Sequence, residues 1–301
     1  MMAMDTLVSM KVFRLVAELK SFVAAAGRMN LSTAMVSKHV MHLEKRLGAR
    51  LLNRTSRSVS LTEAGQLYFN QTRQMLEELE DVEGAVTNAV VLPKGVLRVS
   101  APVWVASKSF VNMLADFRQN YPEVRLEIDL SGRLVNLVEE GFDLALRVSP
   151  SPGDHLVARA ITSVSFQFVA APGYVERAGM PEDLGDLVHH ELLWYTGMPT
   201  DTSAFPPGLL KKGVALKLVP VLSSANETLL HLAALQEMGI AFLPSWLVAE
   251  DVSAGRLVTV LSDTSALSHP LLAVYPSRKY LSSKIRTFID FMIQSDCISR
   301  A

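Results

Sequence analysis

Residues 7–48 place the strongest constraint on the fold, because their apolar spacing and capping residues divide them into three short helices. Apolar residues recur at helical spacing over residues 7–19. Ser21 is a good N-cap for a second, Ala-rich helix, whose small side chains allow a neighbouring helix to approach closely. Ser32 caps a third helix that Gly48 ends. This succession of short helices predicts a helix-turn-helix.

The third predicted helix carries one polar face, suited to the major groove of DNA. Hydroxyl groups and lysine can reach base edges and phosphates, whereas acidic side chains would be repelled. No acid occurs between Glu18 and Glu44. Residues 51–54 and 59–61 predict a two-stranded wing with arginines near its tip, where the negative potential of a minor groove would favour them. The candidate DNA contacts are Ser32, Thr33, Ser37, Lys38, His42, Arg54 and Arg57.

The charge distribution sets this module apart from the rest of the chain. Residues 1–60 contain ten Lys and Arg against three acids, a net charge of +7, and the remainder carries −8. A basic module on an acidic remainder suggests a polyanion partner for the module alone. The alternative is a solvated helical surface that happens to be basic, and charge alone does not decide between them.

A pattern of spaced residues runs from Ser21 to Gly65, and its members are Ser21-Phe22, Ala25-Ala26, Ser32, Val36-Ser37, Leu43-Glu44, Leu47-Gly48, Leu51-Leu52, Arg54 and Leu61-Thr62-Glu63-Ala64-Gly65. With this pattern, residues 21–65 resemble the N-terminal domain of LysR-type transcriptional regulators. The resemblance implies a helix-turn-helix at about residues 21–40, in a winged DNA-binding domain of residues 5–62 that binds promoter DNA. Two positions depart from the family pattern. Thr33 stands where Gln is common and cannot make the bidentate adenine contact open to Gln, and Leu52 replaces the usual Phe.

A long helix is predicted over residues 63–92, with Thr62 as its N-cap. Its apolar residues recur at alternating spacings of four and three, the seam of helices that pair through knobs-into-holes packing. The alternative is an amphipathic helix that packs on the core of its own chain. The resemblance implies a dimerising linker helix, in a homodimer or a tetramer. The candidate dimerisation residues are Met75, Leu79, Val82 and Val86.

Residues 95–301 alternate predicted strands and helices, which indicates an α/β domain with largely parallel sheets. They resemble the family's effector domain, a two-lobed fold like that of type 2 periplasmic binding proteins. The resemblance implies lobe I at 95–163 plus 270–301 and lobe II at 164–269, with a cleft between them. A helix start predicted at Val103-Trp104 would favour a small organic anion there. The candidate effector residues are Ser100, Val103, Trp104, Arg147, Ser224 and Asn226.

Other classes of protein find less support in the sequence. The single Cys297 excludes a disulfide framework, and adjacent His189 and His190 lack the spacing of a metal site, so we expect no cofactor and no metal. A secreted solute-binding protein would need an export signal and leaves the basic module unexplained, and no catalytic motif supports an enzyme. We therefore expect a cytoplasmic regulator with no membrane partner, for which RNA polymerase is a further candidate partner.

Overall fold

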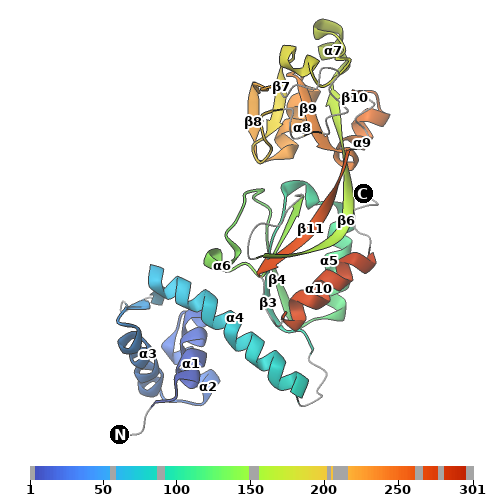
Figure 1. Cartoon of the computed structure of the whole chain (residues 1–301). Helices are drawn as coiled ribbons and strands as arrows, with labels where there is room; N and C mark the ends of the chain where they lie inside the picture. Colours follow the sequence, from blue (N-terminus) through green and yellow to red (C-terminus); the bar gives the residue numbers. More distant parts are fainter. Residues whose placement is uncertain are drawn as a thin grey trace. The chain divides into compact units, whose positions relative to one another are not determined.

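A computed structural model gives the fold of the chain (Figure 1). It describes residues 4–54, 59–86, 92–148, 156–201, 205, 216–261, 267–276 and 281–295. The chain forms two compact units. The first comprises Met1–Leu92, Asn136–Gly141 and Arg278–Ser283, and the second comprises Pro93–Val135, Phe142–Ser277 and Lys284–Ala301. None of the helices in the described ranges is long and apolar enough to cross a membrane.

The first unit is a three-helix module with a two-stranded wing, followed by one long helix. Side-chain caps set its helix starts: Ser21 accepts a hydrogen bond from the Ala24 amide at 3.2 Å, and Thr62 accepts one from the Gly65 amide at 2.9 Å. The elements are α1 (Thr6–Leu19), α2 (Phe22–Met29), α3 (Thr33–Leu47), β1 (Leu52–Arg54), β2 (Val59–Leu61), α4 (Glu63–Val86) and α6 (Leu137–Glu140).

The core of this unit joins α1, α3 and α4. Phe13 of α1 is fully buried and lies edge-on to Phe69 of α4, with ring centroids 6.5 Å apart. Gly65 packs so closely on the main-chain carbonyl of Leu51 that a Cβ atom there would overlap it. The residues at 28–31 predict the turn between the second and third helices. The turn is shorter in the structure, because α2 continues to Met29 and Asn30 ends it in the left-handed conformation.

Helix α6 belongs to this first unit and packs on α4. The Asn70 side-chain amide donates to the Glu139 carbonyl at 2.9 Å, and the Arg73 guanidinium donates to the Gly141 carbonyl at 3.0 Å. The sequence predicts a longer helix here, over residues 134–140. The helix is shorter because Asn136 caps it by accepting from the Glu139 amide.

The second unit contains a nine-stranded sheet in the order β4-β3-β5-β11-β6-β9-β7-β8, with β10 beside β6. The sheet is mixed rather than largely parallel, because β6 and β11 run antiparallel to their neighbours. Its elements are β3 (Gly95–Ser100), the 3-10 turn η1 (Val103–Val105), α5 (Lys108–Asn120), β4 (Val124–Asp129), β5 (Leu144–Val148), β6 (Leu156–Ala170), α7 (Pro172–Ala178), the 3-10 turn η2 (Asp186–His189), β7 (Leu192–Tyr195), β8 (Leu222–Ser224), α8 (Glu227–Leu235), β9 (Ile240–Pro244), α9 (Ser245–Ser253), β10 (Val258–Val260), β11 (Leu267–Pro276) and α10 (Ser283–Ser295).

Two long strands run through both lobes of this unit (Figure 1). Strand β6 is continuous over 15 residues, whereas the sequence predicts two strands, at 157–161 and 166–171. Strand β6 pairs antiparallel with β11, and the pairing extends from Leu156 opposite Pro276 to Phe166 opposite Leu267. Strand β5 adds to one part of this ladder and β9 to another. We call the part around β3–β5 lobe I and the part around β7–β10 lobe II.

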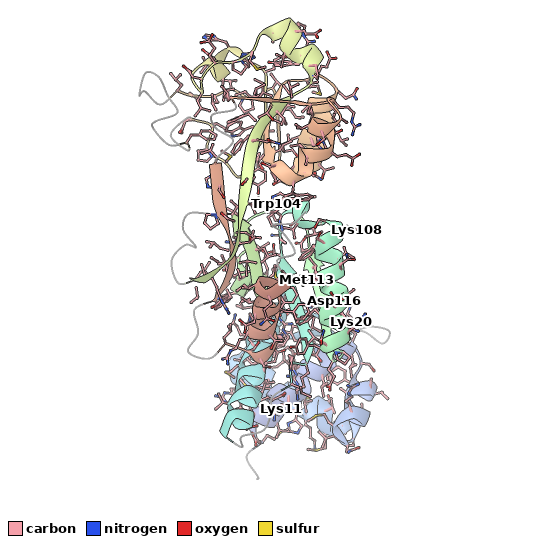
Figure 2. All side chains as sticks on the ribbon, turned by 90° about the vertical axis from the view of Figure 1, so that its right-hand side faces the viewer. Lys11, Lys20, Trp104, Lys108, Met113 and Asp116 are labelled. Carbon is pink, nitrogen blue, oxygen red and sulfur yellow. The ribbon has the colours of Figure 1, made fainter. Side chains whose placement is uncertain are left out.

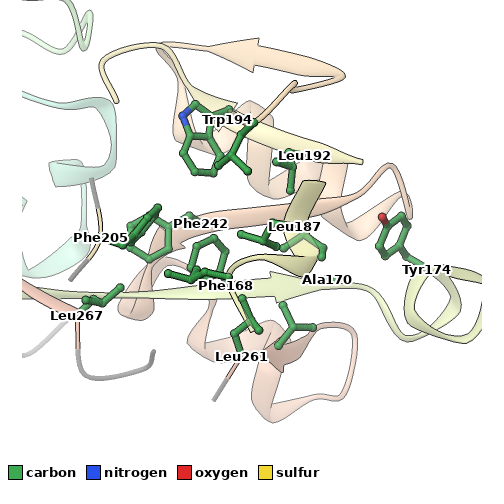
Figure 3. Packing of buried hydrophobic residues seen from close by; sticks show 14 residues of the cluster. Phe168, Ala170, Tyr174, Leu187, Leu192, Trp194, Phe205, Phe242, Leu261 and Leu267 are labelled. Carbon is green, nitrogen blue, oxygen red and sulfur yellow. The ribbon is translucent and has the colours of Figure 1, made fainter. Parts of the chain in front are cut away.

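Each lobe has its own core. In lobe I, Phe117 of α5 meets Phe288 of α10 edge-on, with centroids 5.0 Å apart. A buried ion pair accompanies it: Lys284 Nζ lies 3.2 Å from an Asp143 carboxylate oxygen, which also accepts from the Arg98 amide. In lobe II, aromatic and aliphatic side chains, among them Phe168 and Trp194, fill the space between the sheet and its covering elements (Figure 3).

Candidate DNA-binding and effector-binding sites

Helix α3 is fixed to α1 by two polar contacts. The buried His39 ring nitrogen Nδ1 lies 2.9 Å from the Ser9 hydroxyl, and the Arg46 guanidinium donates to the Thr6 hydroxyl at 2.6 Å. Burial lowers the pKa of His39, and the nearby His42 lowers it further, so the neutral ring is favoured. These contacts hold one face of α3 inward and leave the other to solvent.

The exposed face of α3 carries part of the predicted DNA-binding set. Ser32, Thr33 and Lys38 are exposed, and the Ser32 hydroxyl also caps the helix by accepting from the Met35 amide at 3.2 Å. Ser37 is half-buried. His42 is half-buried as well, and its Nε2 atom is buried without a hydrogen-bond partner. The first turn and Lys38 are therefore the accessible part of this face.

The wing follows α3 and is tied to it by Glu44. One carboxylate oxygen accepts from the Leu51 amide at 3.0 Å and from the Leu52 amide at 3.3 Å. Strands β1 and β2 pair antiparallel, as the sequence predicts. The tip, with Arg57, and the side chain of Arg54 lie outside the described residues. Glu44 thus has a structural role, because its carboxylate holds the start of the wing against α3. This role accounts for the presence of an acidic residue in so basic a module.

The candidate dimerisation residues on α4 are only partly exposed. The Met75 side chain is 48% exposed, and Leu79 and Val82 are half-buried. The side chain of Val86 lies outside the described residues. The side chain of the neighbouring Leu76 is buried, at 1% exposed. One face of α4 therefore packs on its own chain while Met75 stays accessible on another.

The helix start predicted at Val103-Trp104 is wrong. Residues 103–105 form a single 3-10 turn, and α5 begins later because the Ser107 hydroxyl caps it by accepting from the Phe110 amide at 3.1 Å. Trp104 lies just before α5, near Lys108 (Figure 2). A turn this short offers no row of free amides, so the physical basis for an anion at this position is lost.

Trp104 instead forms part of the contact between the two lobes. Its side chain is 3% exposed and packs against Phe166 of β6 and Trp246 of α9, with ring centroids 6.4 and 6.3 Å away. A second contact lies beside it. The Tyr195 hydroxyl donates to the Gly132 carbonyl at 2.8 Å, and burial raises the pKa of Tyr195.

Gly132 allows the lobes to meet closely. It has a φ of +66°, and a Cβ atom there would lie 2.5 Å from the Ala225 carbonyl oxygen and 3.7 Å from a Val103 methyl group. The predicted residue Val103 is therefore brought near the turn that carries Ser224. Ser100, at the end of β3, is buried.

The remaining predicted effector residues have local partners. The half-buried Arg147 donates to the Val135 carbonyl at 2.6 Å, and burial lowers its pKa. Asn226 caps α8 by accepting from the Thr228 amide at 3.0 Å. Ser224 accepts from the Asn226 amide, also at 3.0 Å. The Ser224 hydroxyl and the Asn226 side-chain oxygen thus stabilise the N-terminal end of α8.

Sequence reasoning missed three residues of this region. Glu227, the first residue of α8, is 5% exposed, and its Oε2 atom has no hydrogen-bond partner. Burial raises its pKa to about 7, against the opposing effect of its own main-chain amide. The indole Nε1 of Trp246 is also buried without a partner. The third missed residue is Tyr195, which lies on β7, a strand that the sequence does not predict. An acid after Asn226 is an ordinary helix start, so nothing in the sequence signals the burial of Glu227.

The histidines at 189 and 190 have a structural setting. The His190 Nδ1 atom lies 3.2 Å from the Tyr174 hydroxyl, which also accepts from the Glu191 amide at 2.9 Å. Across the described ranges, no group of three or more His, Cys, Asp or Glu residues is arranged to hold a metal ion. Cys297 lies outside those ranges.

Known proteins resemble the chain along nearly its whole length. Residues 7–66 match the bacterial regulatory helix-turn-helix proteins of the lysR family, and residues 92–296 match the LysR substrate binding domain. The HTH-type transcriptional regulator CrgA of Neisseria meningitidis serogroup C (strain 8013) is 32% identical over 291 residues, covering 94% of each protein.

Two solved structures extend the comparison. The structure of CrgA from Neisseria meningitidis, a LysR-type transcriptional regulator, superposes with a TM-score of 0.55 at 31% identity, covering 95% of this chain and 97% of that one. The full-length structure of the Vibrio cholerae virulence activator AphB gives 0.54 at 27% identity, covering 97% and 99%. With its helix-turn-helix module and its substrate-binding domain, the chain belongs to the LysR family of transcriptional regulators.

Proposed function

We propose that this regulator binds promoter DNA as a dimer or higher oligomer through the exposed face of α3, and that an effector bound between the lobes controls it. The observation that carries the DNA-binding part is the exposure of Ser32, Thr33 and Lys38 on one face of a helix fixed from behind by His39. Lys38 contacts a phosphate or a base edge, and the wing arginines contact the backbone or the minor groove. Met75 and its neighbours on α4 contribute to the dimer.

The effector part of the proposal rests on the contact between the lobes. Small-molecule sites favour such junctions, where apolar walls surround a few polar groups. Trp104 and Phe166 supply apolar walls, and Arg147 is a half-buried cation beside lobe I strands. An effector that binds one arrangement of the lobes better than another shifts the protein toward that arrangement. The protein would act in the cytoplasm, where promoter DNA lies, and it would carry out no catalysis on the effector.

A gel-shift on DNA flanking its own gene, with excess random competitor and a salt series, tests the DNA-binding part. Lys38→Ala should weaken binding, and if Lys38 contacts a phosphate it should reduce the salt slope by about one counterion. Lys217→Ala is the matched control, because it removes an exposed lysine from lobe II. Unchanged affinity of Lys38→Ala across the salt series would contradict the role of Lys38. The absence of specific binding by folded wild type would contradict the proposal itself.

A further inference from the structure

The first turn of α3 presents small side chains to solvent. Ser32, Thr33 and Ala34 are exposed, and Met35 after them is 37% exposed. The Ser32 hydroxyl oxygen accepts from the Met35 amide at 3.2 Å and so holds the start of the helix. None of these four residues carries a side-chain amide or a guanidinium group. The turn therefore lacks the groups that read a single base through two hydrogen bonds.

The side of α3 that carries this turn suits DNA. An exposed alanine or threonine is ordinary on a helix surface, so its exposure alone assigns no function. No acid occurs between Glu18 and Glu44, and the Glu44 carboxylate accepts from main-chain amides at the start of the wing. Lys38 is exposed four residues after Ala34, which places both on the same side of the helix. The first turn therefore shares its side of α3 with a cation that attracts the phosphates of DNA.

The major groove offers one apolar group to such a turn. This group is the 5-methyl of thymine, and the methyl groups of Ala and Thr side chains make apolar contact with it. Contact between two methyl groups removes apolar surface from water on both molecules. Thr33 stands where the family commonly has Gln, whose amide makes a bidentate contact with adenine. With Thr33 in its place, the apolar group available at this position is a methyl group, and the base that it matches is thymine.

We propose that Thr33 and Ala34 set the sequence specificity of this regulator by placing their methyl groups against thymine 5-methyl groups in the major groove. Cγ2 of Thr33 and Cβ of Ala34 make these contacts, and Lys38 contributes affinity through its charge. This inference rests on the proposed function, in which α3 binds promoter DNA, and it adds the feature of the bases that the helix reads.

The packing behind α3 supports contacts of such short range. The attraction between two carbon atoms falls by a quarter to a half when a gap of about 0.5–1 Å opens between them. Val36 and Val40 of α3 are fully buried, and the buried His39 Nδ1 atom lies 2.9 Å from the Ser9 hydroxyl. Because Thr and Ala side chains are short, the positions of their methyl groups follow the position of the helix backbone.

The test begins with DNA duplexes that the full-length protein selects from a random-sequence library. In a selected site, each thymine is replaced in turn by deoxyuridine, which lacks only the 5-methyl group. Within the region that the protein protects from nuclease, replacement of a contacted thymine should weaken binding about fourfold, the loss expected for one buried methyl group. Thymines outside this region are the control, and their replacement should leave the affinity unchanged.

Single-methyl variants then show which side chain faces each thymine. Thr33→Ser removes Cγ2 and keeps the hydroxyl, so it should bind the thymine and deoxyuridine duplexes equally at the thymine that Thr33 contacts. Thr33→Val keeps the methyl group and removes the hydroxyl, so it should retain the preference. Ala34→Gly should abolish the preference at the thymine that Ala34 contacts. Thr200→Ser is the matched control, because it makes the same change at an exposed threonine of lobe II.

Each variant is measured on both duplexes, so that a general loss of affinity or stability cancels. Equal binding of the two duplexes by wild type at every protected thymine would overturn the proposal. A preference that survives in the variant carrying both Thr33→Ser and Ala34→Gly would overturn it as well. So would a preference that is lost in Thr33→Val and kept in Thr33→Ser, because the hydroxyl would then read the base.

These outcomes are separate from a failure of the proposed function. Wild type that selects a sequence but does not distinguish thymine from deoxyuridine in it still binds specific DNA, so only the role of the two methyl groups is refuted. Folded wild type that selects no sequence would contradict the proposed function, and this inference would be refuted with it.

Discussion

Replacing Glu227 with Gln should change how the stability of the second unit depends on pH. The Glu227 pKa is about 7 in the folded protein and 4.5 in its ordinary environment. Because the folded value is the higher one, the native state binds more protons than the unfolded state between these two values. Stability is therefore greatest below about pH 4.5 and falls as the pH rises toward 7. In Glu227→Gln this contribution is absent at every pH.

The size of the effect follows from the two pKa values. At 1.36 kcal/mol per pH unit, the rise from 4.5 to about 7 corresponds to about 3 kcal/mol of stability lost by the wild type when the carboxyl ionises. Glu227 is almost completely buried, so solvent screening reduces this figure little. His190, whose pKa burial lowers, contributes with the opposite sign, but it does so equally in both proteins. The difference between wild type and variant thus isolates Glu227.

Urea unfolding followed by tryptophan fluorescence suits this measurement, because all three tryptophans lie in the second unit. At about pH 4, below the unfolded pKa, the two proteins should have similar stability, and at about pH 8 the Gln variant should be the more stable by about 3 kcal/mol. Glu250→Gln should follow the wild-type curve, because Glu250 is an exposed acid on α9 of the same lobe. Parallel curves for wild type and Glu227→Gln would refute the reasoning, since they would show that the buried carboxyl does not titrate in this range.

Three further perturbations follow from the packing. Lys284→Met should destabilise the second unit by about 3–5 kcal/mol, because the buried Asp143 carboxylate loses its ammonium partner, although the Arg98 amide still donates to it. Addition of Asp143→Leu should restore part of the loss in urea unfolding, and a larger loss in the double variant would count against this account. Gly65→Ala should unfold the DNA-binding module, because the added methyl group would overlap the Leu51 carbonyl oxygen. Thermal unfolding followed by circular dichroism tests this, and a melting curve identical to that of wild type would exclude the clash. Met75→Glu should weaken self-association in sedimentation velocity without lowering the Tm, and an unchanged dimer would remove Met75 from the interface.

The capping residues explain why the first unit was largely predictable. Ser21, Ser32 and Gly48 act locally, through hydrogen bonds and backbone angles that the neighbouring residues alone determine. The buried face of α3, with Val36 and Val40, follows from the same periodicity. His39 was the exception: its burial against Ser9 depends on how α1 and α3 pack, which no local pattern of charge or size encodes.

The effector region was harder to predict because long-range contacts form it. The residues around Trp104 predict a helix start there, but the Ser107 hydroxyl caps α5 and the helix begins after it. The sequence predicts two strands where β6 is continuous, and the continuity comes from its long pairing with β11, which is distant in sequence. Glu227 gives no signal in the sequence, since its burial depends on how α8 packs against strands that are distant in sequence, such as β7 and β9.

The antiparallel pairing of β6 and β11 favours bending of the two-lobed unit over sliding of one lobe past the other. Hydrogen bonds in an antiparallel pair run across the strands, so bending both strands together keeps every bond, whereas sliding one past the other would break them. The register shift between Leu271 and Leu272 supplies a local point of bending. The lobes therefore bend relative to each other more easily than they slide. Bending at this point changes the angle between the lobes and leaves the hydrogen bonds of the β6–β11 pair formed.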